Sequence, residues 1–207
     1  MNGDRYYSKF GLGGALLLVL CLAGCRGNPG RTSVKDGYLL NIQRPGVELK
    51  LKWPVEVRQC KAAAAFAARN LLYRISPVQY EVDRFNTLIV PMDQQLTEAM
   101  QRWFRCDTEQ ESSEPRNGHL VVEATLDELV GDFVNRTEPK AHVQIHFVVT
   151  FRQGRIRQPV LDQVYSAGVS MHPSPTAGQV VTAMSRGVEQ VLQQFEADLV
   201  KSQQYTK

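Results

Sequence analysis

Residues 143–151 read Val-Gln-Ile-His-Phe-Val-Val-Thr-Phe, and this stretch decides the fold more than any other. Its odd-numbered positions are all apolar, whereas the even-numbered positions are mostly polar. Successive side chains of a strand point to opposite faces, so this alternation predicts a strand with one buried face. Residues 120–127 alternate in the same way, and Gln153-Gly154 is a suitable tight turn into a third strand over residues 160–169. We expect these three strands to lie in one sheet.

Two segments have the spacing of an amphipathic helix. The first follows Pro91, a residue that suits the first turn of a helix. Its apolar stripe consists of Leu96, Ala99, Met100, Trp103 and Phe104. The second begins near Ser174-Pro175, and Ser174 is the expected N-cap. Its stripe consists of Val181, Met184, Val188, Val191, Leu192, Phe195 and Leu199. Each helix is apolar along one side, so both should pack against a sheet.

Shorter strands are expected nearer the N-terminus. Residues 38–42 form an apolar run that predicts the first strand, and the alternation over residues 49–57 predicts a strand pair or one bent strand. Residues 71–75 and 80–83 flank a turn and predict two more. The order is strands, helix, three strands and helix. It predicts an α+β fold, with a largely antiparallel sheet and two amphipathic helices packed on one side.

The chain has 207 residues and a formal net charge of +3. The first 24 residues hold Asp4, Arg5 and Lys9 and so account for +1, which leaves +2 for the rest. This charge is too small to suggest a nucleic-acid partner. Residues 25–36 are polar and rich in helix breakers, which favours a flexible tether. Residues 37–200 suit a single domain, and residues 201–207 form a polar tail.

The N-terminal segment has the parts of a secretory signal. Basic residues precede a short apolar run, 10–25, that ends in Leu22-Ala23-Gly24-Cys25. This ending resembles the bacterial lipoprotein signal, which implies that residues 1–24 are a signal peptide cleaved before Cys25. Cys25 would then carry diacylglycerol on its sulfur and an N-acyl chain such as palmitate on its amine. Residue 26 is Arg and not Asp, which by the same resemblance implies an outer-membrane lipoprotein facing the periplasm of a Gram-negative bacterium. An ordinary signal peptide or an uncleaved anchor helix is the alternative.

Few residues suggest catalysis or metal binding. Two interpretations of Cys60 and Cys106 are open. They form a disulfide, which the periplasm permits, or they are two buried free thiols. His142 and His146 share a strand face; they could be metal ligands, but their position among core residues favours side chains that simply point outward. The chain lacks the common hydrolase, metalloprotease and nucleotide-binding motifs. We therefore expect neither an enzyme nor a resident metal or cofactor.

Several stretches resemble the auxiliary lipoprotein components of ABC-type transport systems, which work beside MCE-domain lipid transporters. The likeness extends from about residue 37 to residue 200 and is carried by residues 38–40, 71–75 with 80–83, Pro91 with 96–99, and 128–133. The sequence departs from the family pattern at Phe85–Ile89, where an aromatic stretch with tryptophan is expected.

The resemblance implies a lipid-anchored periplasmic domain that docks with an MCE-domain protein and an ABC permease and ATPase. Together they would move lipids or other apolar cargo between the inner and outer membranes, and the domain would act by docking and not by catalysis. Self-association into a homo-oligomer is a further expectation. The alternative function is an envelope or secretion-system assembly lipoprotein that binds another protein or the cell wall.

Four residues are the candidates for contacts with a partner: Tyr73, Tyr80, Arg84 and Phe85. Packing in the core or at a sheet edge is the other interpretation of these side chains. The neighbouring run Leu88-Ile89-Val90 either packs under the first helix or forms an exposed apolar patch.

Overall fold

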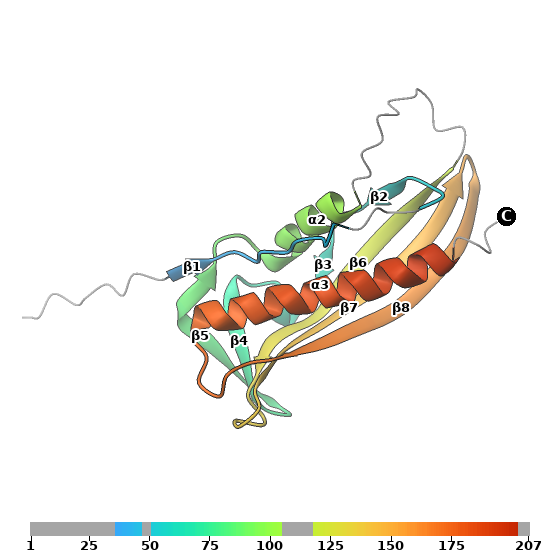
Figure 1. Ribbon diagram of the computed structural model, residues 1–207. Coiled ribbons are helices and arrows are strands. Elements are labelled where there is room, and N and C mark those ends of the chain that lie inside the picture. The colour runs from blue at the N-terminus through green and yellow to red at the C-terminus, as the bar shows by residue number, and fades with distance from the viewer. Residues whose placement is uncertain (1–35, 47–50, 105–117, 203–207) are drawn as a thin grey trace, which may run out of the picture. The chain divides into compact units, whose positions relative to one another are not determined.

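The structure is a computed structural model that describes residues 36–46, 51–104 and 118–202. These residues form one eight-stranded mixed sheet and two α-helices (Figure 1), so the predicted α+β fold is confirmed. Cys25, Cys106 and the predicted signal peptide and tether up to residue 35 lie outside the described residues. None of the described helices has the length and apolar character that crossing a membrane requires.

The three long strands are β6 (His119–Asp132), β7 (Lys140–Gln153) and β8 (Ile156–Ser170), and they are antiparallel neighbours. Every second residue of β7 from Ala141 to Phe151 is buried, as the alternation predicted. The turn after β7 contains Gly154 with φ +58°, a left-handed conformation that glycine adopts without strain. In β6 the register shifts between Leu126 and Glu128, and after this bulge Leu129 returns to the core.

Three short strands follow one another along the other edge of β6, and all run parallel to it. They are β2 (Val55–Val57), β3 (Lys61–Ala62) and β4 (Asn70–Ser76). The sheet is antiparallel in its long pairs and parallel in these short ones. The predicted strand over residues 49–57 is reduced to three residues: 47–50 lie outside the described residues, and the ladder begins where the Pro54 carbonyl accepts the N–H of Leu120 at 2.9 Å.

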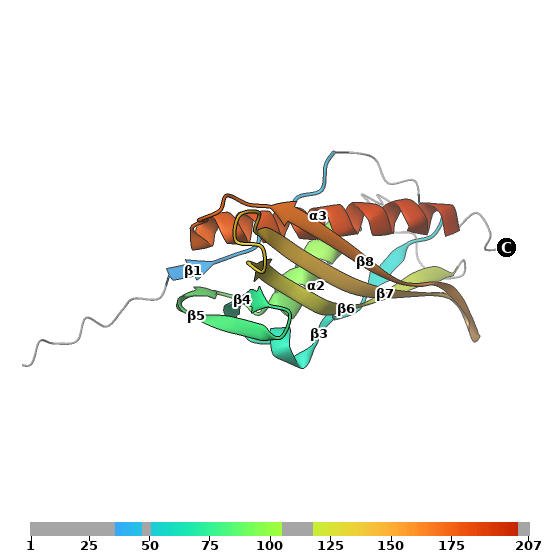
Figure 2. The same cartoon turned by 90° about the horizontal axis from the view of Figure 1, so that it is seen from below.

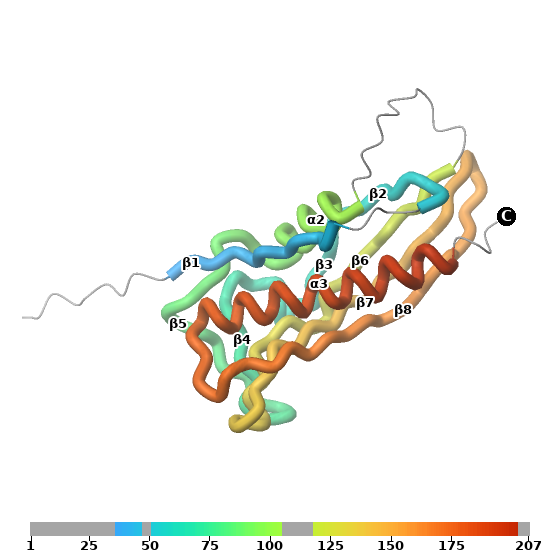
Figure 3. Tube along the Cα trace, in the orientation of Figure 1, coloured from blue at the N-terminus to red at the C-terminus, as the bar shows by residue number. Residues whose placement is uncertain are grey.

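The strand predicted over residues 38–42 is wrong beyond its first residue. Tyr38 ends β1 (Asp36–Tyr38), which pairs in parallel with the end of β5 (Gln79–Leu88). The chain then runs between the two helices, α2 (Met92–Trp103) and α3 (Ala177–Ser202) (Figure 3). Leu40 N–H donates to Gln95 Oε1 at 2.7 Å, and Asn41 N–H donates to Ser185 Oγ at 3.1 Å. Helix side chains therefore replace the neighbouring strand that this segment lacks.

The second helix begins later than expected and has a different cap. Gln179 N–H donates to Thr176 Oγ1 at 3.3 Å, and Thr176 N–H donates to Gln179 Oε1 at 2.8 Å. This reciprocal pair is a capping box, so Thr176 and not Ser174 is the N-cap. Ser174 is two residues too early to reach the free N–H groups of the first turn.

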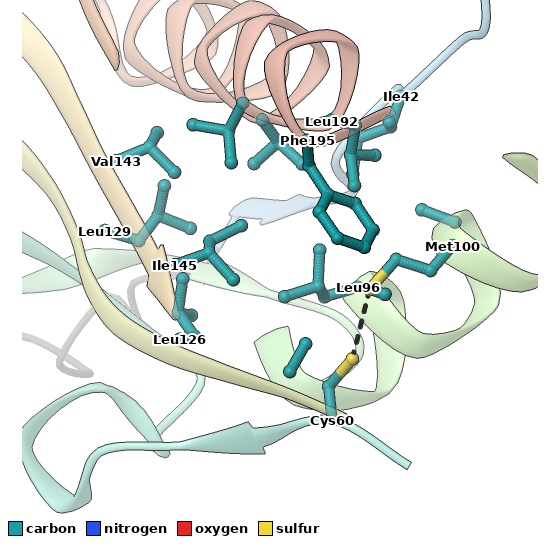
Figure 4. Close-up of a cluster of buried hydrophobic side chains, with 14 of the residues drawn as sticks. Ile42, Cys60, Leu96, Met100, Leu126, Leu129, Val143, Ile145, Leu192 and Phe195 are labelled. Atoms are coloured by element: carbon teal, nitrogen blue, oxygen red, sulfur yellow. Dashed lines mark hydrogen bonds between the residues drawn. The ribbon is translucent and has the colours of Figure 1, made fainter. Parts of the chain in front are cut away.

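Both helices cover the same side of the sheet (Figure 2), and the core lies between them and the strands. Leu96 and Met100 of α2, Leu192 and Phe195 of α3 and the inward residues of β6 and β7 meet there (Figure 4). The Phe195 ring stacks on Phe147 with centroids 4.0 Å apart and planes 6° from parallel. All stripe residues predicted for the two helices are buried. We call the helix-free side of the sheet the outer face.

Candidate docking surface

The hairpin of β4 and β5 exposes an unusual amount of apolar surface. Val78, in the turn, is 90% exposed, and Val82 and Tyr80 on β5 are 51% and 43% exposed. Val134 is exposed in the loop after β6, next to Asp132, a residue that is bonded to the hairpin. We call Val78, Tyr80, Val82 and Val134 the hairpin surface. Several large apolar side chains gathered in one region are typical of an interaction site.

An ionic cluster on the outer face fixes the hairpin to the long strands. Arg74 of β4 donates to Glu128 Oε1 at 2.7 Å and to Asp132 Oδ2 at 2.6 Å. Tyr80 O–H donates to the same Glu128 oxygen at 3.3 Å, and His142 Nε2 of β7 lies 3.2 Å from Glu128 Oε2. This Arg74 cluster therefore joins four strands. It holds Tyr80 against the sheet and leaves the valines on either side of it uncovered.

The charges in the Arg74 cluster stabilise one another. The hydrogen bond to Asp132 is the main reason that the pKa of Arg74 is raised above its ordinary value. Partial burial alone would raise the pKa of Asp132, but the hydrogen bonds from Arg74 and from the Val134 N–H outweigh it and lower that pKa. Asp132 is therefore ionised at neutral pH, and it positions both the hairpin and the backbone of the loop that carries Val134.

A wide bulge distorts β5 beyond Val82. Leu72 of β4 pairs with Val82, whereas Asn70, only two residues earlier in β4, pairs with Thr87. The extra residues are organised by Asp83, whose Oδ1 accepts the N–H groups of Phe85 and Asn86, each at 2.9 Å. Such a turn, closed by an aspartate side chain on the backbone that follows it, has a well-defined conformation.

The other carboxylate oxygen of Asp83 faces the neighbouring strand. Asp83 Oδ2 accepts the O–H of Tyr73 at 2.7 Å and the side-chain amide of Asn86 at 2.9 Å. Burial and this carboxylate together raise the pKa of Tyr73, so its hydroxyl remains a proton donor. Partial burial opposes ionisation of Asp83, but its hydrogen bonds, with that from Tyr73 first among them, still lower its pKa. The conformation of the bulge is thus fixed by hydrogen bonds between residues of the hairpin itself.

The four predicted contact residues all lie on this hairpin, but the structure separates their roles. Tyr73 is half-buried, with its ring edge-on to Phe133 at 5.6 Å, and it supports the bulge. Tyr80 is partly exposed and belongs to the Arg74 cluster. Arg84 and Phe85 project from the bulge, and Phe85 is 62% exposed. Only the last two are free of a structural role within the described residues.

Sequence reasoning did not single out the three valines of the hairpin surface. Val78 follows Ser76-Pro77, and an apolar residue inside a turn is a signal that could have been noticed. Asp83 was also missed as an organising residue, although aspartate two and three positions before the N–H groups it accepts is a known turn pattern. Val134 could not have been found, because only the β6–β4 pairing brings its loop to the hairpin.

The two histidines considered as metal ligands have separate partners. His142 lies against Glu128, whereas His146 Nε2 lies 2.6 Å from Asp162 Oδ1 on β8. In the described part of the chain, no three His, Cys, Asp or Glu side chains come together as a metal site would require. A shallow depression of about 530 Å³ lies beside His146, and the Arg58 and Glu123 side chains that line it pair with each other at 2.6 Å.

Cys60 is buried, and its Sγ lies 3.4 Å from Met100 Sδ of α2. Burial raises the pKa of this thiol to about 11, so it is protonated at neutral pH. Because Cys106 lies outside the described residues, a disulfide between the two cysteines stays a prediction.

Comparison with known proteins adds the fold and nothing finer. No family model matches the chain, and no curated protein matches it. Protein XCC0632 from Xanthomonas campestris, described under the family DUF330, is 14% identical with a TM-score of 0.65, over 83% of this chain and 99% of that one. A structure described as an uncharacterized protein is 15% identical with a TM-score of 0.55, over 81% and 97%. Identities this low indicate a shared fold and leave the activity open.

Proposed function

We propose that this protein is a lipid-anchored periplasmic accessory subunit of an ABC/MCE-type transport system, and that it acts by docking and not by catalysis. The observation that carries the proposal is the hairpin surface: Val78 and Val82 lie two residues on either side of Tyr80, which the Arg74 cluster holds in place, and Val134 is exposed in the loop after Asp132. A fixed apolar surface with a polar, hydrogen-bonded centre suits a protein partner.

Two features of the sequence support the rest of the proposal. The N-terminal segment that ends at Cys25 resembles a lipoprotein signal, and acyl chains on that cysteine would attach the domain to the outer membrane. The stretches that resemble transport auxiliary lipoproteins include residues 71–75 and 80–83, and these lie within β4 and β5. The partner at the hairpin surface is then an MCE-domain protein, and the cargo is lipid or another apolar molecule.

The proposal is tested with a photo-crosslinking amino acid placed on the outer face. Val82 is the test position, and Val164 of β8 is the matched control, because their exposed fractions are 51% and 48% and both lie on this face. Each variant is irradiated in intact cells, and the crosslinked proteins are identified after purification from membranes. We expect an MCE-domain protein to be crosslinked from position 82 and not from position 164.

Two outcomes would contradict the proposal. Recovery of secretion or pilus components alone from position 82 would replace it with the alternative, an envelope assembly lipoprotein. Equal yields of one adduct from both positions would show that the hairpin surface is not the docking site.

A further inference from the structure

A second group of exposed apolar side chains lies where the described chain begins. Leu39, Phe85 and Ile89 are 53%, 62% and 54% exposed. The Ile89 N–H donates to the Tyr38 carbonyl at 2.9 Å, which continues the parallel pairing of β1 with β5 and sets Leu39 beside Ile89. Phe85 lies four residues before Ile89, in the bulged part of β5, and its side chain is exposed as well. We call these three residues the N-terminal patch.

The backbone under the N-terminal patch is fixed. A Cβ atom on Gly37 would come within 2.7 Å of Ile89 Cγ1, so the isoleucine lies directly across β1. Leu88 and Leu40, which adjoin Ile89 and Leu39 in sequence, are buried and hold both segments on the core. Phe85 is held by the Asp83 turn. The three side chains are therefore presented on an ordered surface and not on a frayed end.

Two exposed arginines and two carboxylates border the patch. Arg84 precedes Phe85, and Arg69 adjoins the patch because its carbonyl accepts the N–H of Leu88 at 2.7 Å; both arginines are exposed. Two acidic side chains lie beside the patch as well: Asp36 at the start of β1, and Asp83, whose carboxylate accepts the N–H of Phe85 and the O–H of Tyr73. Apolar side chains bordered by arginine are the composition that binds the interface of an anionic membrane.

We propose that the N-terminal patch rests on the membrane to which Cys25 is anchored, and that it orients the domain there. The inference rests on the lipidation in the proposed function. Eleven residues, 25–35, connect the anchor to β1. At roughly 3.5 Å each they reach about 38 Å at most, so the start of β1 stays within that distance of the anchor. Val78 and Ile89 lie beyond opposite ends of β5, so this contact would leave the Val78 end of the hairpin farther from the membrane than the Ile89 end.

The test uses the full-length lipoprotein, purified and reconstituted into vesicles of phosphatidylethanolamine and phosphatidylglycerol with brominated acyl chains. Phe85→Trp is the test variant. Ile156→Trp is the control, because Ile156 is 60% exposed and follows the turn after β7, at the other end of the long strands. The wild type already contains two tryptophans, Trp103, which is buried, and Trp53, which is half-buried. The fluorescence of the wild type is therefore subtracted as background. Bromine on the acyl chains quenches the fluorescence of a tryptophan only when the ring reaches the acyl chains. Apolar side chains of a membrane-bound surface reach this depth.

We expect the fluorescence added by Phe85→Trp to fall by about half in brominated vesicles, because a surface of this kind enters roughly 5–10 Å into the membrane interface. That of Ile156→Trp should be unchanged. Replacing Arg84 by Gln should reduce the quenching, and omitting phosphatidylglycerol should do the same. Absence of quenching at position 85 in protein that mass spectrometry shows to be acylated would overturn the inference and leave the proposed function intact. If a photo-crosslinking amino acid at position 85 joined two copies of the chain and no quenching were seen, the patch would be assigned to a second copy instead. An unacylated chain would contradict the proposed function itself.

Discussion

The hydroxyl of Tyr73 lies 2.7 Å from Asp83 Oδ2, across the two strands of the β4–β5 hairpin. This hydrogen bond joins the half-buried Tyr73 of β4 to Asp83, the residue that organises the exposed bulge of β5. Asp83 uses its remaining acceptor capacity on Phe85 and Asn86, so the position of Phe85 depends indirectly on the half-buried Tyr73. Tyr73 is in this sense a positioning residue for the N-terminal patch.

Replacing Tyr73 by Phe should reduce the free energy of unfolding by about 1.5–3 kcal/mol, because the carboxylate loses a hydrogen bond. Asp83→Asn should have a similar effect, and the double variant should lose less than the sum, since both remove the same contact. Urea denaturation of the four proteins measures the coupling. Strict additivity would mean that the two side chains do not stabilise each other.

Stability should fall in acid through Asp83 and Asp132. The folded-state pKa of each is lower than the ordinary 3.8, so their contribution is complete above that value and is lost as the pH falls through the folded pKa. Arg74→Gln should destabilise the protein by about 2 kcal/mol at neutral pH, because it leaves partly buried carboxylates uncompensated. The difference from wild type should shrink between neutral pH and about pH 2.5, as the pH falls toward the lowered folded-state pKa of Asp132. Denaturation at the two pH values provides the comparison, and a constant difference would show that the ion pairs are not its cause.

Gly187 should tolerate no side chain while Val143 is present. A Cβ at Gly187 of α3 would lie 2.7 Å from Val143 Cγ2, which is buried against the helix. Gly187→Ala should therefore cost about 1–3 kcal/mol of overpacking, from which roughly 1 kcal/mol of helix propensity is recovered. Val143→Ala in the same chain should relieve the clash. Thermal unfolding of both variants tests this, and a Gly187→Ala protein more stable than wild type would contradict the close approach.

Cys60 should react slowly in the folded protein. With a pKa of about 11 the thiol is almost entirely protonated, and at pH 8 only roughly one molecule in a thousand would carry a thiolate. A Cys106→Ser variant isolates Cys60 from any disulfide. Iodoacetamide should label it only after denaturant is added. Rapid labelling under native conditions would show that the segment between β2 and β3, which contains Cys60, opens.

Cys25→Ser should abolish acylation and signal processing, because the serine hydroxyl cannot form the thioether to diacylglycerol. We expect the variant to keep residues 1–24 and to leave the outer-membrane fraction. Intact mass and membrane fractionation supply the measurements. A wild-type mature chain without fatty acid would remove the basis of the anchoring proposal.

The alternation over residues 120–127 and 143–151 was enough to predict the central strands, and the stripes after Pro91 and near Ser174 predicted both helices. These features depend on the period of side-chain directions along the chain, which is local. Sequence reasoning failed at residues 39–42, where a short apolar run predicted a strand but the neighbours are two helices and not a strand. It also misplaced the helix cap, because Ser174 and Thr176 are equally plausible caps in isolation.

The sequence by itself determined the three long strands and the two helices, which of their sides are buried, and where the chain carries a lipoprotein-like signal. Only the tertiary structure decided that β2, β3 and β4 follow the edge of β6 and that Arg74 meets Glu128 and Asp132. It also decided that Leu39 lies beside Ile89. The physical reason is the range of the interactions: side-chain periodicity is set within a few residues, whereas the Arg74 cluster joins groups more than fifty positions apart.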